Sequence, residues 1–455
     1  MKKRYLRMER KLGKRVAAVT MVGTLALSCL AGCSSNSAEG SKDVENKDVV
    51  TLQVWGGMPA ENGLEQMADA FNSSHDDIQI EYVYYTNDDA GNTKLDMSLM
   101  AGGDTDVFFS HNDALLNKRI DSGNALNLTE FFEKYDFDPK EALGEGVEEY
   151  SRDGVYHYLP TVSSNTFLLY NKDMFEEAGV ELPSEGWTYD DFYAAAKALT
   201  KDGVYGFYFP SWDSGQPATE FAKRALGEDW MYNEDGTAVQ IDHPEIKDAF
   251  EKYMTRVEEG IEVDFVDNKT QQMTPEDMFL QGKAAMVYAN WIVRYVKDTD
   301  TYPHDFETGF APVPKLSADQ EHLYVSGLSD ALSINNKSEH KEEAMEFMHW
   351  YITEGVTYLA EYGRIGAYTG LDKEALADKV FSGCEDMFDL ESAQKFYLTG
   401  GDVAVRTITT ASTEINTILT EEFEKTFAGE QSIDEAITTS QERAQKAFEE
   451  AQSAE

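Results

Sequence analysis

Apolar and polar residues succeed one another along the chain in patterns that predict short strands alternating with amphipathic helices. The first apolar run, 49–55, has strand length and ends in two glycines. Further strands are predicted at 78–85 and 107–109, with a helix at 94–101 between them. One buried helical face precedes them, formed by Leu64, Met67, Ala68 and Phe71. The order strand, helix, strand, helix, strand predicts a parallel, doubly wound sheet.

The rest of the chain continues this alternation. Strands are predicted at 165–170, 205–209, 284–288, 306–314 and 331–334. Helices are predicted at 171–179, 188–199, 244–259, 274–282, 342–352, 403–427 and 433–451. Thr188 and Thr274 each stand three residues before an aspartate, which indicates helix N-caps, and Gly282 marks a helix end.

The segment 279–291 predicts a possible ligand site. Its apolar strand, 284–288, is followed at once by Asn290 and Trp291. In α/β proteins, ligands bind beyond the carboxyl ends of strands. A buried core position for Trp291 is the alternative.

Length and charge restrict the class of protein. A chain of 455 residues favours two domains, and 42% hydrophobic residues is a globular value. The formal net charge of −45 excludes a nucleic-acid backbone as the main partner and argues against an anionic ligand. Neutral polar and cationic ligands remain.

The N-terminus has the pattern of a secretion signal. Eight basic residues precede an apolar stretch, 16–31, which is too short and weak for a good membrane span. The sequence Leu30-Ala31-Gly32-Cys33 resembles a bacterial lipobox, in which the cysteine becomes the lipid-modified first residue of the mature protein. An ordinary signal with an incidental cysteine is the alternative. The polar stretch that follows predicts a flexible tether.

The sequence offers little for metal or catalytic chemistry. After cleavage and lipid modification of Cys33, only Cys384 would remain as a thiol, so no disulfide framework is possible. The eight histidines are scattered without metal-ligand spacing, and no phosphate-binding glycine loop or nucleophile motif occurs. No cofactor, metal or catalytic residue is therefore predicted.

Aromatic, amide and hydroxyl residues recur just beyond predicted strand ends. They include Trp55, Ser110 to Asp113, Asn165, Trp212 with Asp213, and Asn290 with Trp291. An aromatic face packs on the C–H face of a sugar ring, while amides and carboxylates bind its hydroxyls. The pattern alone is equally compatible with core aromatics.

Several stretches, in order, resemble the extracellular solute-binding proteins of carbohydrate ABC importers, of the maltodextrin-binding type. They are the lipobox, 51–56, 100–108, 168–175 with 178–179 and 187–188, 282–286 with Trp291, and 341–347. The most specific are Tyr170-Asn-Lys-Asp173 and Gly282-Lys-Ala-Ala-Met286.

The resemblance implies an α/β, two-lobed, type II periplasmic-binding-protein-like fold, each lobe a sheet flanked by helices, with the ligand cleft between lobes. The chain would cross between lobes near 159–165, 324–330 and 363–370. The expected organisation is a signal peptide, 1–32; a tether, 33–47; an N-terminal lobe, 48–160 plus 331–365; and a C-terminal lobe, 161–330 plus 366–455.

The resemblance also implies a function and a set of contacts. The protein would be lipid-anchored at Cys33 on the outer face of the bacterial membrane, capture a neutral sugar by hinge closure, and pass it as a monomer to membrane permease subunits. Expected ligand contacts are Gly57, Met58, Ser110, Asp113, Ser164, Asn165, Trp212, Asn290, Trp291 and Arg406.

Three alternatives remain open at this point. An anchored glycoside hydrolase would need two carboxylates at catalytic separation. The same fold could bind a cationic, non-sugar ligand. It could also serve as a sensor or adhesin.

Overall fold

The computed structural model describes residues 49–102, 104–111, 113–210, 216–399, 401–403, 405, 408 and 410–454. These residues belong to one compact unit of the chain, 48–455. The predicted signal peptide, the predicted tether and Cys33 lie outside the described residues. Among the described helices, none is long and apolar enough to cross a membrane.

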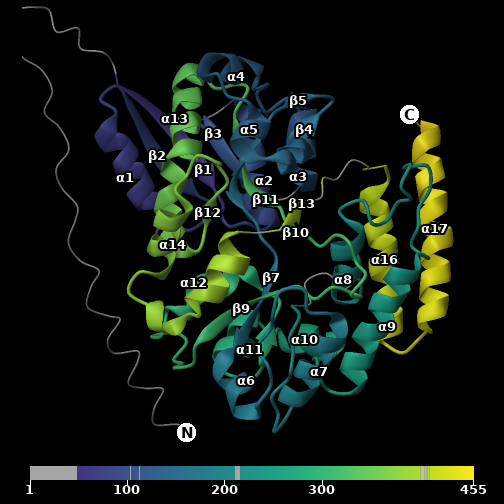
Figure 1. Cartoon of the computed structure of the whole chain (residues 1–455). Coiled ribbons are helices and arrows are strands. Elements are labelled where there is room, and N and C mark those ends of the chain that lie inside the picture. The colour runs from purple at the N-terminus through teal and green to yellow at the C-terminus, as the bar shows by residue number, and fades with distance from the viewer. Residues whose placement is uncertain are drawn as a thin grey trace, which may run out of the picture. The chain divides into compact units, whose positions relative to one another are not determined.

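A six-stranded sheet, the large sheet, forms the core of the first part of the fold (Figure 1). Its strand order is β12-β6-β11-β3-β1-β2. The bounds are β1 Val50–Gly56, β2 Ile78–Tyr84, β3 Val107–Ser110, β6 Leu159–Ser163, β11 Leu328–Ile334 and β12 Ile365–Gly366. The first three strands are parallel, as the sequence predicts, whereas β11 is antiparallel to both β3 and β6.

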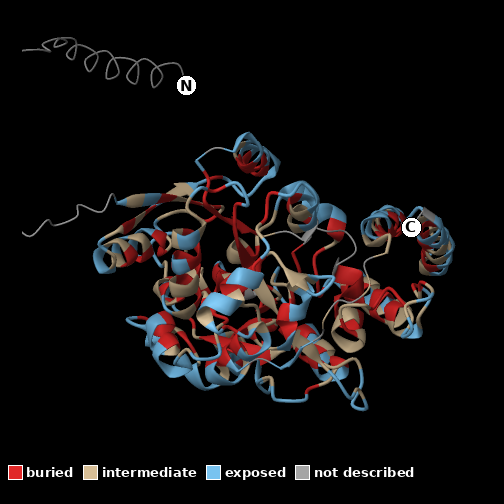
Figure 2. Ribbon diagram, turned by 90° about the horizontal axis from the view of Figure 1, so that it is seen from above, coloured by how far each residue is buried: buried red, intermediate tan, exposed pale blue. Residues whose placement is uncertain are grey.

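Helices and a short hairpin surround the large sheet. They are α1 Leu64–Ser74, α2 Asp89–Ala101, α3 Asp113–Asp121, α4 Thr129–Tyr135, α5 Pro139–Leu143, α13 Lys341–Thr353, and the hairpin β4 Ser151–Arg152 with β5 Val155–Tyr156. The predicted apolar face of α1 buries Leu64, Met67 and Phe71 in the core of this part. Burial follows the strands and the inner faces of the helices (Figure 2).

A three-stranded sheet, the small sheet, organises the second part of the fold. Its order is β8-β7-β9, and both outer strands are antiparallel to β7. The bounds are β7 Phe167–Asn171, β8 Met286–Val287 and β9 Thr308–Pro312. The predicted strand at 205–209 is only partly formed. Its pairing with the β8 segment consists of two isolated parallel bridges, made by Tyr205 and Tyr208.

Many helices pack around the small sheet and in a separate apolar cluster beside it. They are α6 Lys172–Ala178, α7 Tyr189–Leu199, α8 Gln216–Leu226, α9 Pro244–Glu258, α10 Phe265–Gln271, α11 Pro275–Leu280, α12 Val293–Val296, α14 Lys373–Phe381, α15 Leu390–Ser392, α16 Ser412–Phe427 and α17 Ile433–Ala454. Figure 1 shows α16 and α17 side by side next to α9.

The local start and stop signals behave as the sequence predicts. Thr188 and Asp191 form a reciprocal capping box on α7, and Thr274 caps α11. Gly282 adopts φ +67°, which glycine alone tolerates at little cost. One prediction is wrong: the helix expected from Val403 begins at Ser412, and Asp402–Val403 instead form β13, which pairs with β10 (Tyr324–Ser326). Tertiary pairing has overridden helix propensity there.

The chain passes between the two sheets at three places. The segment 164–166 joins β6 to β7, the segment after β9 returns through β10 to β11, and the segment after β12 leads to α14. Backbone bonds tie the first two passages together: Ser164 N donates to Gly327 O at 2.8 Å, and Thr166 N donates to Val325 O at 2.7 Å. These passages lie at or beside the predicted crossings.

Candidate functional site

One edge of the large sheet collects most of the described residues that the sequence singles out. Because β1 and β3 are parallel and β11 is antiparallel to β3 and β6, the carboxyl ends of β1, β3 and β6 meet at the edge where β11 begins. The pairs Ala331↔Ser110 and Leu328↔Ser163 fix this register. Gly57, Ser110 and Ser164 therefore follow or end strands at one edge, which is where ligands bind in open α/β sheets.

The small sheet presents Trp291 toward the same crossing. Val287 of β8 pairs with Leu169 of β7, and the two strands run antiparallel. The carboxyl end of β8 thus lies beside the amino end of β7, close to Asn165. Beyond it, the 3-10 helix η3 (Asn290–Ile292) carries Trp291, which is half-buried against the core of the small sheet.

The predicted contacts differ in what their side chains do. Met58 is 5% exposed in the core of the large sheet, and its carbonyl accepts a 2.7 Å bond from the Tyr82 hydroxyl. Asn165 spans the crossing, because its amide nitrogen donates to Tyr397 O at 2.8 Å and its oxygen accepts from Ser326 Oγ at 3.1 Å. Ser164 is half-buried beside it.

Some predicted contacts cannot be compared with the structure. Trp212, Arg406 and Cys33 lie outside the described residues. For Asp113 and Asn290 the backbone is described as part of α3 and η3, but the side chains are not.

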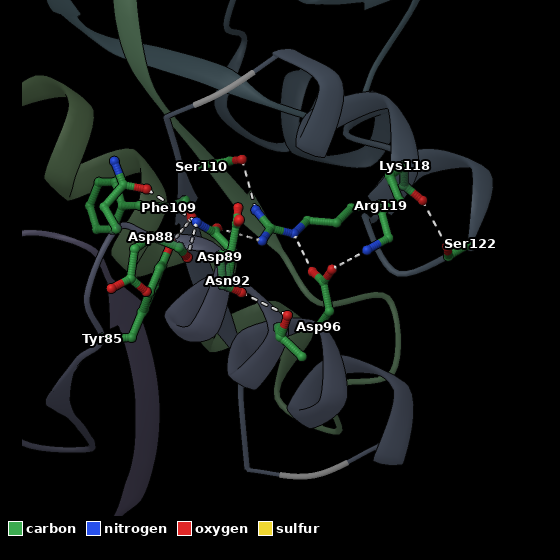
Figure 3. Close-up of polar contacts among 12 residues, drawn as sticks. Tyr85, Asp88, Asp89, Asn92, Asp96, Phe109, Ser110, Lys118, Arg119 and Ser122 are labelled. Carbon is green, nitrogen blue, oxygen red and sulfur yellow. Dashed lines mark hydrogen bonds and ion pairs between the residues drawn. The ribbon is translucent and has the colours of Figure 1, made fainter. Parts of the chain in front are cut away.

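Ser110 ends β3 inside a buried polar network (Figure 3). The guanidinium of Arg119, on α3, donates to Ser110 Oγ at 2.8 Å, to Asp96 Oδ1 at 2.8 Å and to Asn92 Oδ1 at 3.0 Å. Ser110 and Arg119 are each 1% exposed. Burial raises the pKa of Asp96, but the bonds and charges of Lys118 and Arg119 outweigh it and lower that pKa. The network joins α2, α3 and the end of β3.

A second buried group stands at the same edge. His111 Nδ1 lies 2.7 Å from Asp330 Oδ1, and the guanidinium of Arg364 bonds the other oxygen of Asp330. Burial tends to raise the pKa of Asp330, but the charge of Arg364 and the hydrogen bonds from His111 and Arg364 hold it well below its usual range. Asp330 also has φ +54°, a left-handed conformation that aspartate adopts more readily than most residues.

A third network includes Tyr288, three residues before Trp291 in the chain. The hydroxyl of Tyr288, at the end of the β8 segment, donates to the buried carboxylate of Glu220 on α8. Arg224 donates to the same carboxylate at 2.5 Å and to the carbonyl of Tyr324 at 3.1 Å. Burial raises the pKa of Glu220, yet Arg224 and Lys223 lower it overall. This network ties α8 and the β8 segment to the crossing strand β10.

His111 lies in the strand-end loop, Ser110 to Asp113, that the sequence analysis singled out, but no sequence pattern indicates its pairing with Asp330 and Arg364. No pattern indicates the pairing of Glu220 with Arg224 either. Each of these carboxylates is one among 84 acidic residues. No group of three or more metal-ligating side chains occurs among the described residues.

Three hollows lined by described residues lie away from these positions. A groove of about 550 Å³ lies between α10 and α16, and smaller hollows of about 310 Å³ and 360 Å³ lie beside α14 and α7. None is lined by a predicted ligand contact. The candidate site is thus defined by the convergence of strand ends and polar networks.

Comparison with known proteins identifies the family to which the chain belongs. The sequence profile of the family described as bacterial extracellular solute-binding protein matches residues 56–358. A putative binding protein of Brucella abortus is 25% identical over 288 residues, which are 55% of this chain and 65% of that relative. The match thus spans just under two thirds of the relative's length. The melibiose/raffinose/stachyose-binding protein MelE of Bacillus subtilis is 22% identical over 71% of this chain and 74% of its own.

A solved structure shares the fold. The ABC substrate-binding protein Lmo0181 of Listeria monocytogenes, in complex with cycloalternan, superposes with a TM-score of 0.71 at 23% identity, covering 88% of this chain and 100% of that one. This likeness confirms the predicted α/β, two-lobed fold. The family match confirms the resemblance to importer-associated solute-binding proteins, and it confirms a binding protein in place of the glycoside hydrolase alternative.

Proposed function

Because the chain belongs to the bacterial extracellular solute-binding protein family, we propose that it captures a neutral sugar, most simply an oligosaccharide, for delivery to an ABC importer. The observation that carries the proposal is the convergence at the crossing. Gly57, Ser110 and Ser164 follow or end strands at one edge of the large sheet, and the end of β8 brings Trp291 toward the same crossing. An aromatic platform facing polar strand ends suits a sugar.

Charge and relatives support a neutral ligand. The net charge of −45 disfavours an anion unless a local basic site compensates. Three of the cations near the crossing, Arg119, Arg224 and Arg364, each bond a buried carboxylate. MelE, which is similar over most of its length, is by name a binding protein for melibiose, raffinose and stachyose.

The binding mechanism is population shift between an open and a closed form. A sugar that contacts both sheets stabilises the closed form by its differential affinity. The three passages between the sheets act as the hinge, with the N-terminal lobe at 48–160 plus 331–365 and the C-terminal lobe at 161–330 plus 366–455. Lipid attachment at Cys33 holds the monomeric receptor at the outer face of the membrane, next to the permease subunits.

The test is a thermal-shift screen of the full chain with raffinose, stachyose, maltotriose, sn-glycerol-3-phosphate and spermidine. A ligand that binds only the folded state at 100 times its Kd raises the unfolding free energy by about 2.7 kcal/mol. We expect at least one of the three oligosaccharides to raise Tm and the charged compounds to leave it unchanged. A shift with spermidine or the phosphate alone would contradict a neutral ligand.

Solution scattering then tests the hinge. The sugar that raises Tm should reduce the radius of gyration at saturation. An unchanged radius with a bound sugar would contradict closure while leaving sugar binding intact.

A further inference from the structure

His111, Asp330 and Arg364 form a buried chain of contacts that joins three separate segments. His111 follows β3, Asp330 lies in β11, and Arg364 immediately precedes β12. The Nδ1 of His111 is 2.7 Å from one carboxylate oxygen of Asp330, and Arg364 bonds the other. Asp330 is 6% exposed, and its carbonyl accepts a 2.8 Å bond from Thr161 Oγ1 in β6. Four strands of the sheet edge are thereby linked through one residue.

The charge of Asp330 decides which nitrogen of His111 carries hydrogen. Burial tends to raise the pKa of Asp330, but the charge and hydrogen bond of Arg364 hold it well below its usual range, so the side chain is a carboxylate. A carboxylate only accepts hydrogen bonds, so Nδ1 of His111 must be the donor across the 2.7 Å contact. In the neutral ring, Nε2 is then a bare acceptor.

The Nε2 atom of His111 is buried and has no hydrogen-bond partner among the described residues. The edge of the imidazole ring that carries Nε2 faces the loop after β1. A β-carbon added to Gly57 would lie 3.3 Å from both Nε2 and Cδ2. A buried polar atom without a partner destabilises the folded protein, so a ligand group that supplies the missing hydrogen bond is favoured there. Gly57 is itself a predicted ligand contact.

Two other partly buried histidines near the large sheet, His75 and His157, differ from His111. His75 Nδ1 lies 3.0 Å from Phe71 O, and His157 Nδ1 lies 3.1 Å from Ala125 O. Both contacts are to backbone carbonyls, whereas His111 is held by a carboxylate that also binds a cation from the crossing. Its orientation is thus fixed by groups 219 and 253 positions along the chain.

We propose that Asp330 is a positioning residue that fixes His111 as the Nδ1–H tautomer, and that His111 Nε2 accepts a hydrogen bond from a hydroxyl group of the bound ligand. The second half rests on the proposed function, since it takes the ligand to be a polyhydroxylated sugar. A bare acceptor beside Gly57 favours a hydroxyl and disfavours phosphate or carboxylate oxygens, which also carry lone pairs.

The positioning role is tested without ligand. The full chain is labelled with ¹⁵N-histidine, and long-range ¹H–¹⁵N correlation spectra, assigned with His111→Gln, report which ring nitrogen is protonated. We expect a protonated Nδ1 and a bare Nε2 in the wild type. In Asp330→Asn, which keeps a residue that tolerates positive φ, the amide can donate to Nδ1, and the pattern should change to Nε2–H.

Glu422→Gln is the matched control for this measurement. Glu422 is a 2% exposed carboxylate bonded by Lys425 and Arg443 on the α16–α17 pair. Its replacement should leave the His111 spectrum unchanged. A protonated Nε2 in the wild type, or an unchanged pattern in Asp330→Asn, would overturn the positioning role.

The ligand role is tested by calorimetry with the oligosaccharide that raises Tm. His111→Phe should weaken binding at least about tenfold, because it removes the acceptor and retains a ring. His111→Gln should stay within about threefold of the wild type, because its side-chain oxygen can replace Nε2. His157→Gln, the control, should bind as the wild type does.

Equal affinities for wild type and His111→Phe, or a His111→Gln as weak as His111→Phe, would overturn the ligand role. Circular dichroism melts confirm that each variant is folded. If no oligosaccharide binds the wild type, the proposed function fails, whereas the spectra of the free protein still decide the role of Asp330.

Discussion

Arg256 and Glu262 form an ion pair with 2.7 Å between Arg256 Nε and Glu262 Oε2, and both residues are almost completely buried. The Arg256 guanidinium also donates to the Tyr189 hydroxyl at 2.9 Å. Aromatic rings surround it within 6 Å of its central carbon, namely Tyr189, Phe192, Phe207, Phe221 and Tyr253. The core of the second part of the fold thus encloses a cation that is paired and stacked on aromatic faces.

Arg256→Met should lower the free energy of unfolding by about 3–5 kcal/mol, because it leaves Glu262 buried without its partner. The double variant Arg256→Met with Glu262→Met should recover part of this loss, since no buried charge then remains. Lys197→Met, which breaks the exposed pair with Glu259, should change it by less than about 1 kcal/mol. Urea denaturation measures all three, and a small loss in Arg256→Met would contradict the account.

Arg119→Met should be destabilising by about 3 kcal/mol, because Asp96, Asn92 and Ser110 all lose a buried donor. The matched variant is Arg152→Met, whose pair with Asp121 is exposed. That change should cost less than about 1 kcal/mol. Denaturation midpoints that fall equally in the two variants would refute the structural role of Arg119.

The stability difference between wild type and Asp330→Asn should depend on pH. Asp330 has a folded-state pKa below the unfolded value of about 3.9. The folded protein therefore binds fewer protons at this site, and the stabilisation is fully present above the unfolded pKa. It is lost as pH falls toward the folded pKa. Urea denaturation from neutral pH to about pH 3 should show the difference shrinking below about pH 4, and a constant difference would disprove the assignment.

Trp291→Ala should weaken binding of the identified sugar at least about tenfold, which corresponds to about 1.4 kcal/mol, while the fold persists because Trp291 is only half-buried. Trp187→Ala is the contrasting control. Trp187 is 6% exposed and donates to Pro312 O at 2.8 Å, so its loss should lower Tm and leave affinity unchanged. Calorimetry showing unchanged affinity in Trp291→Ala would remove the stacking role.

Cys33→Ser should release the protein from the membrane fraction, because the lipobox cysteine is the proposed site of lipid attachment. Cys384→Ser should stay in the membrane fraction, since Cys384 is a buried free thiol on the second part of the fold. Fractionation followed by immunoblotting distinguishes the two. Retention of Cys33→Ser would argue for an ordinary secretion signal or another means of attachment.

Much of the local structure follows from the sequence. The apolar face of α1, the capping box at Thr188 and the left-handed stop at Gly282 each depend on residues a few positions apart. Local patterns failed where distant pairing decided the conformation. Val403 pairs with β10 instead of opening a helix, and 205–209 reaches β8 only through isolated bridges.

In the candidate site, too, the sequence predicts some features and leaves others to the tertiary structure. Ser110 and Trp291 could be selected because patterning places strand ends, whereas Gly57 was selected by the family resemblance. Side-chain roles could not be selected. The sequence cannot tell that Ser110 accepts from Arg119, or that the side chain of Met58 belongs to the core.

The sequence by itself determined the alternation of strands and helices, the acidic surface charge and the family, because these depend on composition, short-range periodicity and ordered motifs. Only the tertiary structure decided which of the 84 acidic residues are buried and paired with a basic side chain. His111 and Asp330 are separated by 219 positions and meet because β3 and β11 pair in one sheet. Such pairing is fixed by the packing of the whole core, which no local pattern encodes.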